Sequence, residues 1–114
     1  LSGSIPAAYG SLTTLTILNL GRNTLSGNIP YSIGRLLNIH LLAFEGNSLT
    51  GDIPSSLAKL PAVEEVRLQD NKLKGQVATE ICDWYSERKF KFGLDCEVKC
   101  TCCRDNPLYC SNGH

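Results

Sequence analysis

The sequence contains no methionine, one tryptophan and only two histidines among its 114 residues. Histidine is the commonest general acid–base group in enzymes, so its scarcity leaves little material for catalysis. No hydrophobic run approaches the roughly 18 residues that a membrane-spanning helix needs, so we expect no membrane insertion within this segment. The 11 basic and 11 acidic side chains cancel, which removes the electrostatic attraction that nucleic acid or an anionic membrane surface requires.

Charge and cysteine are scarce in the first half of the chain. Residues 1–60 hold five charged side chains, and no cysteine occurs before Cys82. No secretory leader is visible, and the first residues already fall within a repeat, so we expect a mature product or a fragment of a longer protein. The apolar fraction of 42% is that of a globular chain rather than a disordered one.

A 24-residue repeat runs through this charge-poor part. Leu-Ser-Gly-Ser-Ile-Pro at residues 1–6 returns at 25–30 and 49–54, and in weaker form at 73–78. The residues between these segments follow the pattern LxxLxLxxNxL. It is carried by Leu15, Leu18, Leu20, Asn23 and Leu25, then by Ile39, Leu42, Phe44, Asn47 and Leu49, and then by Val63, Val66, Leu68, Asn71 and Leu73. A fixed period of this length is typical of a solenoid.

The pattern predicts one short strand in each coil. Leu18 and Leu20 are spaced by a period of two, which suits a short strand with one face buried. Strands of successive coils would pair in parallel about 4.8 Å apart, and stacking would bury apolar side chains that no coil can bury alone. We therefore predict an α/β solenoid of about four coils plus a C-terminal cap, with a concave parallel β-sheet and an irregular or 3-10 convex side. Residues 1–83 would form the array, with a truncated first repeat, and residues 84–114 the last atypical coil and the cysteine-rich cap.

An asparagine ladder is predicted at the turn after each strand. Asn23, Asn47 and Asn71 share one register, and an amide can both donate and accept, so each can bridge two coils. The alternative is an ordinary surface-turn asparagine. Asp95 follows at the same spacing, and an ionised carboxylate accepts without donating, so it can close the ladder.

The 24-residue frame also predicts a fourth strand at Phe90–Phe92. In this register Phe90 follows Val66, and Trp84 takes the place of Leu60. The apolar pattern then decays, as a terminal repeat requires.

The concave face supplies the candidate ligand-binding residues, because the positions around the two inward leucines of each strand are expected to face it. They are Thr16, Ile17, Asn19, His40, Leu41, Ala43, Glu45, Glu64, Glu65, Arg67, Gln69, Lys89 and Lys91. Ile17 and Leu41 would lie side by side with Ala43 nearby, as an apolar anchor for a partner. The alternative is a small apolar patch without a ligand.

The second half of that face is expected to be charged. The 24-residue register places Glu64 beside Arg88 and Glu65 beside Lys89. Such pairs either give polar selectivity or form a solvated face that neutralises itself. His40 would lie next to Glu64, where it could titrate near neutral pH or act as a plain polar surface residue.

The cysteines cluster near the C-terminus, in a segment with few apolar side chains. They are Cys82, Cys96, Cys100, Cys102, Cys103 and Cys110. Six cysteines fit three disulfides, which would stabilise a cap that cannot pack a core, and their pairing stays open. Zinc binding is the rival interpretation, but paired Cys-x2-Cys knuckles are missing. We therefore expect disulfides, no metal, no cofactor and an oxidising compartment.

The repeats resemble the plant-specific leucine-rich repeats, on the LxGxIP half-repeat that covers roughly residues 1–83. This family includes ectodomains of plant receptor-like kinases and receptor-like proteins, and polygalacturonase-inhibiting proteins. The resemblance implies a right-handed superhelix that binds proteins, peptides or cell-wall polymers. The segment Leu94-Asp-Cys-Glu-Val-Lys-Cys-Thr-Cys-Cys also resembles the C-terminal cap of leucine-rich-repeat proteins from diatoms and related algae.

These features favour a secreted or extracellular recognition module that binds a protein, peptide or glycan and is not an enzyme. No nucleophile lies beside a base and an orienting acid, and no phosphate-binding loop occurs. The alternative is a structural protein that adsorbs to a periodic solid such as ice or cell-wall polymer. The predicted concave rows are heterogeneous, which favours recognition.

Overall fold

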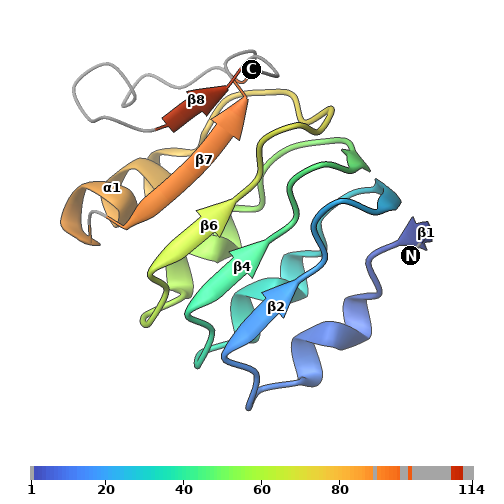
Figure 1. The fold of residues 1–114 in the computed structure, drawn as a ribbon. Helices are drawn as coiled ribbons and strands as arrows, with labels where there is room; N and C mark the ends of the chain where they lie inside the picture. Colours follow the sequence, from blue (N-terminus) through green and yellow to red (C-terminus); the bar gives the residue numbers. More distant parts are fainter. Residues whose placement is uncertain (1, 89, 96–97, 99–108, 112–114) are drawn as a thin grey trace.

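The computed structural model describes residues 2–88, 90–95, 98 and 109–111. These residues form a solenoid in which each coil contributes one strand to a parallel sheet (Figure 1). In chain order the elements are β1 (Ser2–Ser4), η1 (Ala7–Ser11), β2 (Ile17–Asn19), β3 (Thr24–Gly27), η2 (Tyr31–Arg35), β4 (Leu41–Ala43), β5 (Ser48–Leu49), η3 (Ser55–Lys59), β6 (Glu65–Arg67), α1 (Thr79–Arg88), β7 (Lys91–Asp95) and β8 (Tyr109–Ser111).

The concave sheet has the strand order β2-β4-β6-β7-β8, and all its strands run parallel. Leu18 lies opposite Leu42, and Leu42 lies opposite Val66, which is the predicted 24-residue register. All three side chains are buried. The predicted α/β solenoid with a concave parallel sheet is therefore confirmed, because alternation along the strand and the fixed period together determine both features.

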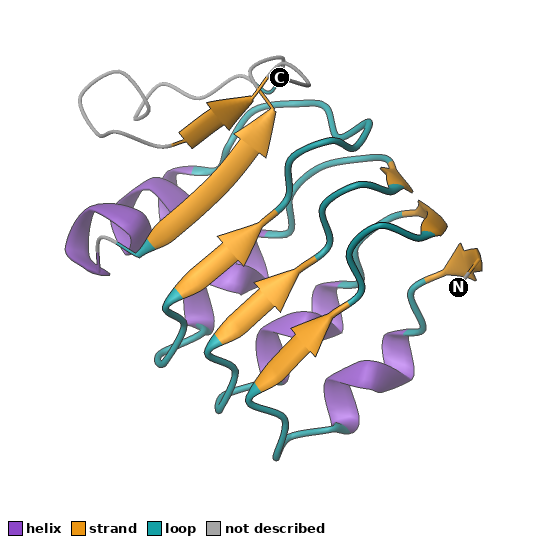
Figure 2. Ribbon diagram, viewed as in Figure 1, coloured by secondary structure: helices purple, strands orange, loops and turns teal. Residues whose placement is uncertain are grey.

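Three 3-10 helices line the opposite side of the molecule (Figure 2). Each begins directly after the proline of the repeat, whose fixed φ suits the entry into a helical turn. The helices approach closely because glycine lies between them. A Cβ on Gly34 would come within 2.4 Å of the Ser56 carbonyl oxygen, and Gly10 has the same relation to Ser32.

A second, three-stranded parallel sheet with the order β1-β3-β5 was not predicted. It forms from the Leu-Ser-Gly half of each repeat, where Gly3 lies opposite Leu25 and Gly27 opposite Leu49. Both leucines are buried, whereas Ser26, which follows Leu25 in β3, is exposed. Gly27 has φ +78°, a left-handed conformation that explains why the repeat keeps glycine here.

The last coil departs from the period because an α-helix replaces the 3-10 helix. The longer α1 delays the next strand, so Val66 lies opposite Phe92 and not Phe90. The predicted fourth strand therefore forms, but β7 begins at Lys91, and its pairing with β6 lies two residues later than the 24-residue frame placed it. Trp84 nevertheless lies under Leu60, to whose carbonyl oxygen its Nε1 donates at 3.0 Å.

Four aromatic rings close the core at this end. Trp84, Tyr85, Phe90 and Phe92 are buried, and the ring centroids of Trp84 and Phe90 are 4.3 Å apart. These rings cover the apolar interior of the third coil, so the end of the solenoid is filled by α1 and β7. Within the residues that the structure describes, no helix has the length and apolar character to cross a membrane.

Candidate functional site

The concave sheet carries an apolar pair on its first two strands. Ile17 on β2 lies directly opposite Leu41 on β4. Ile17 is 58% exposed and Leu41 is half-buried, so both present apolar surface to solvent. The structure thus brings together the two residues that the sequence singled out as an apolar anchor.

Ala43 does not belong to this exposed surface. It is fully buried, so its predicted part in ligand contact is wrong. Ala43 lies in register between Asn19 and Arg67, and its single methyl group projects less far from the sheet than the side chains of these two neighbours. The alternation of residues along a strand predicts which face of the sheet a side chain occupies, but not how far it projects from that face.

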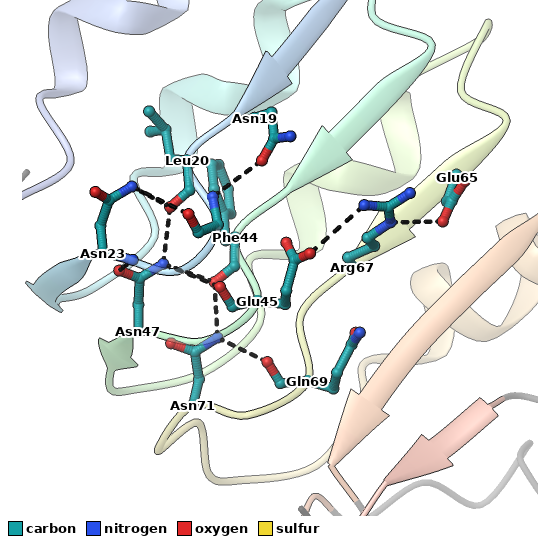
Figure 3. Close-up of polar contacts among 11 residues, drawn as sticks. Asn19, Leu20, Asn23, Phe44, Glu45, Asn47, Glu65, Arg67, Gln69 and Asn71 are labelled. Carbon is teal, nitrogen blue, oxygen red and sulfur yellow. Dashed lines mark hydrogen bonds and ion pairs between the residues drawn. The ribbon is translucent and has the colours of Figure 1, made fainter.

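Arg67 on β6 is the centre of a charged network. Its Nε donates to Glu65 Oε2 at 2.6 Å, and its Nη1 lies 3.5 Å from Glu45 Oε2 (Figure 3). The hydrogen bond to Glu65 raises the pKa of the Arg67 guanidinium. The sequence instead placed Glu65 beside Lys89, which lies outside the described residues. In the structure Glu65 faces Lys91 across the β6–β7 register, two residues from the predicted pairing.

Two glycines pack against polar side chains of the concave sheet. Glu45 Oε1 packs against Gly21, and Gln69 Oε1 packs against Gly93, where an added Cβ would lie 2.4 and 2.1 Å from these oxygens. Both oxygens are buried without a hydrogen-bond partner in the described part of the chain. The sequence predicted Glu45 and Gln69 as concave residues, but the packing role of the glycines was missed. The available signal was the 24-residue spacing of these four positions, which begins and ends with a glycine.

His40 and Glu64 form an exposed pair at the start of β4 and β6. His40 Nδ1 lies 2.8 Å from Glu64 Oε1, and their side chains are 49% and 75% exposed. The backbone of Thr16 joins this edge, since its carbonyl oxygen accepts the N–H groups of His40 and Leu41.

The predicted pair of Glu64 with Arg88 is wrong. Arg88 ends α1, and its guanidinium donates to the carbonyl oxygens of Leu60, Pro61 and Val63. The α-helix directs the Arg88 side chain to the backbone of residues 60–63, whereas the 24-residue frame predicted that Arg88 lies on the concave face. Among the residues that the structure describes, no arginine pairs with Glu64.

The asparagine ladder joins the coils beside the sheet. Asn47 Oδ1 accepts the backbone N–H groups of Asn23 and Leu25, and its Nδ2 donates to the carbonyl oxygen of Leu20 at 2.9 Å (Figure 3). Asn71 repeats these contacts one coil later, with Leu49 and Phe44 as partners. Each amide thus satisfies backbone groups of two coils that the strand ladder leaves unpaired.

Asp95 lies at the end of this ladder. Its Oδ1 accepts the N–H of Asp70 at 2.7 Å, and its Oδ2 accepts that of Asn71 at 3.0 Å. Asp95 is buried within β7. It keeps a 24-residue spacing from Asn71, although the strand itself has shifted by two residues.

The cysteine-rich end is described only in part. Cys82 on α1 is disulfide-bonded, and β8, which contains Cys110, pairs with β7. The side chains of the other five cysteines lie outside the described residues, so the three predicted disulfides remain a prediction. Within the described ranges, no group of three or more histidine, cysteine or acidic side chains could hold a metal ion.

Comparisons with known proteins agree with this architecture. The sequence profile of the leucine-rich repeat matches residues 14–36 and 38–60. No curated protein sequence matches the chain. Among solved structures, the leucine-rich-repeat ectodomain of the Arabidopsis thaliana membrane receptor kinase GASSHO1/SCHENGEN3, in complex with CASPARIAN STRIP INTEGRITY FACTOR 2, is 35% identical. This similarity covers 87% of this chain and 11% of that one, with a TM-score of 0.71.

Two further solved structures are similar over most of the chain. The plant peptide hormone receptor RGFR1 in complex with RGF2 is 36% identical over 88% of this chain and 15% of that chain, with a TM-score of 0.73. A plant ice-binding protein is 36% identical over 73% of this chain and 27% of that chain, with a TM-score of 0.69. The chain therefore spans about a quarter or less of the length of each of these proteins.

Proposed function

The chain belongs to the plant-type leucine-rich-repeat family, and from this premise we propose that it is a non-catalytic recognition module. Its ligand, a protein, peptide or glycan, binds on the concave sheet formed by β2, β4, β6 and β7. The observation that carries this proposal is the exposed apolar pair of Ile17 and Leu41, bordered by a polar network. Apolar side chains held on a rigid sheet beside polar groups are typical of binding anchors.

The solved relatives support this class of function. One is a receptor-kinase ectodomain in complex with a named factor, at 35% identity, and another is a plant peptide hormone receptor in complex with RGF2, at 36% identity. We propose that this chain is likewise secreted or part of an extracellular ectodomain, and that three disulfides stabilise its C-terminal cap. The residues proposed to contact the ligand are Thr16, Ile17, Asn19, His40, Leu41, Glu45, Glu64, Glu65, Arg67, Gln69 and Lys91.

A selection experiment tests this proposal. Peptides are selected from a random library displayed on phage, glycans are screened on an array, and the best binders are measured by calorimetry against the purified chain. Leu41→Glu removes the anchor and is expected to abolish binding. Leu37→Glu is the matched control, because Leu37 is an exposed leucine (54%) just outside the concave strands. Equal binding by both variants would contradict a concave ligand site.

Adsorption to a periodic solid is the second candidate, and the similarity to a plant ice-binding protein favours it. The concave rows are chemically mixed, but the β1-β3-β5 sheet presents hydroxyl groups in register. Ser2 lies opposite Thr24, and Ser4 opposite Ser26, and all four residues are exposed. Parallel pairing sets such groups about 4.8 Å apart, which is a regular spacing on one face.

Thermal hysteresis and inhibition of ice recrystallisation separate the two candidates. Adsorption through β1-β3-β5 predicts activity that Ser26→Lys removes and that Leu41→Glu leaves intact. Recognition through the concave sheet predicts no ice activity in any of these variants.

A further inference from the structure

The Arg67 guanidinium is held along its edge by two carboxylates. Its Nε donates to Glu65 Oε2 at 2.6 Å, and its Nη1 lies 3.5 Å from Glu45 Oε2 (Figure 3). The N–H groups of a guanidinium lie in its plane, so these contacts fix the orientation of the plane and do not occupy its two faces. The Arg67 side chain is 36% exposed, so part of it is open to a ligand.

Glu45, one of the two carboxylates, is itself held in place. Its side chain is only 16% exposed, and its Oε1 packs against Gly21, where an added Cβ would lie 2.4 Å from this oxygen. Gly21 thus leaves the space that the Glu45 side chain needs in order to reach Arg67. A guanidinium that is already ordered loses little conformational entropy when a ligand contacts it.

Arg67 extends from β6 toward the strand that carries Leu41. Ala43 on β4 is the register partner of Arg67, and Glu45 follows Ala43 by two residues on the same coil. Because the Arg67 side chain reaches Glu45, it crosses from its own strand toward β4. Leu41 precedes Ala43 by two residues, so it belongs to the same face of the sheet, about 7 Å along the strand. The row of Arg67 is therefore the neighbour of the row that contains Ile17 and Leu41.

A ligand that meets both rows has to offer apolar surface and a group that suits the face of a guanidinium. An aromatic ring does both, because it packs on aliphatic side chains and its π-electrons attract a cation that lies over its plane. A carboxylate would have to compete with Glu45 and Glu65 for the N–H groups. An aliphatic side chain packs on leucine but gains no such attraction. The chemistry of this area therefore favours an aromatic side chain.

We infer that the partner is a peptide segment, free or part of a folded protein, whose aromatic side chain stacks on the Arg67 guanidinium and packs against Leu41. This inference rests on the proposed concave recognition function and specifies its ligand. Gly21 is a positioning residue in this arrangement, since it acts through Glu45 on the orientation of Arg67.

Parallel selections from the random phage library test the inference, with the full wild-type chain and Arg67→Lys as targets. Lysine keeps the positive charge but lacks the flat guanidinium, so peptides with Trp, Tyr or Phe are expected to be enriched on wild type relative to the variant. A peptide selected on wild type is then synthesised, together with a copy in which Leu replaces its aromatic residue, and both are titrated by calorimetry. Arg67→Lys is expected to weaken binding of the aromatic peptide about two- to ten-fold and to leave binding of the leucine copy unchanged.

Two further variants complete the comparison. Gly21→Ala displaces the Glu45 carboxylate and is expected to weaken binding of the aromatic peptide less than Arg67→Lys does, again without an effect on the leucine copy. Arg35→Lys is the matched control, because Arg35 is an exposed arginine at the end of η2, on the opposite side of the molecule (Figure 2). It is expected to change the binding of neither peptide.

The outcomes separate the inference from the proposed function. Binding that depends on Leu41 but is equal for wild type and Arg67→Lys, or selected peptides without aromatic enrichment over the variant, overturns the inference and upholds the concave site. The absence of any peptide whose binding depends on Leu41 overturns both. An effect of Arg67→Lys without one of Gly21→Ala rejects the positioning role of Gly21 alone. Circular dichroism of each variant confirms that a lost affinity is not a lost fold.

Discussion

Asp95 Oδ2 accepts the backbone N–H of Asn71 at 3.0 Å, at the end of a ladder whose other members are asparagines. Its Oδ1 accepts the neighbouring N–H of Asp70. Both carboxylate oxygens face donors, so the residue ends the ladder by accepting twice. An asparagine here would turn one amide NH2 group toward a backbone N–H.

Asp95→Asn is accordingly expected to destabilise the protein by about 1–3 kcal/mol, because one buried N–H loses its acceptor. Urea denaturation followed by circular dichroism measures this change. Asp83→Asn is the control, since Asp83 is exposed on α1. Equal stability of the two variants would show that the contact to Asp95 contributes nothing to folding.

Asn47→Ala is expected to cost considerably more than Asn38→Ala. The Asn47 side chain accepts two backbone N–H groups and donates to the carbonyl oxygen of the preceding coil. The exposed Asn38 donates one bond to Thr13. Each buried group left without a partner costs about 1–3 kcal/mol, so the difference between the variants should reach several kcal/mol in urea denaturation.

Gly34→Ala is expected to destabilise the stack of 3-10 helices, because the added Cβ meets the backbone oxygen of Ser56 at 2.4 Å. Gly21→Ala is the matched control. There the Cβ meets the end of the flexible Glu45 side chain, which can move aside. Thermal unfolding should show a clearly lower Tm for Gly34→Ala, and a larger loss for Gly21→Ala would contradict the close helix contact.

Leu36→Ala is expected to cost about 2–5 kcal/mol, as is typical of a fully buried leucine. Leu12 holds the same place one coil earlier but is 46% exposed, whereas Leu36 is fully buried. Leu12→Ala should therefore cost less than half as much. Denaturant unfolding of both variants measures the difference, and equal losses would mean that the first coil is as well packed as the second.

Reduction of the purified chain is expected to lower the Tm by several degrees, because a native disulfide stabilises a small domain by about 2–4 kcal/mol. Calorimetry with and without dithiothreitol measures the shift. Chelator treatment is the control and should change nothing. An unchanged Tm on reduction together with bound zinc by mass spectrometry would replace the disulfide assignment with a metal site.

The repeated part of the molecule could be predicted closely. Leu18, Leu42 and Val66 share one register in the sequence and one buried row in the sheet. This agreement has a simple cause, since a coil of constant length returns the chain to the same place in every turn. The pairing of Ile17 with Leu41 followed for the same reason.

The last coil could not be predicted in this way. A fixed period assumes a constant path between strands, and α1 changes that path, so Phe92 takes the place expected for Phe90. The same helix carries Arg88 away from Glu64.

By itself, the sequence determined the solenoid, its period and the apolar pair on the concave face, because these depend on spacing alone. Only the tertiary structure decided which charges meet there. Several carboxylates lie within reach of a long side chain such as Arg67, and it bonds to both Glu45 and Glu65 because of how neighbouring coils pack. The burial of Ala43 has the same origin, because it depends on how far the side chains of neighbouring strands project in the assembled sheet.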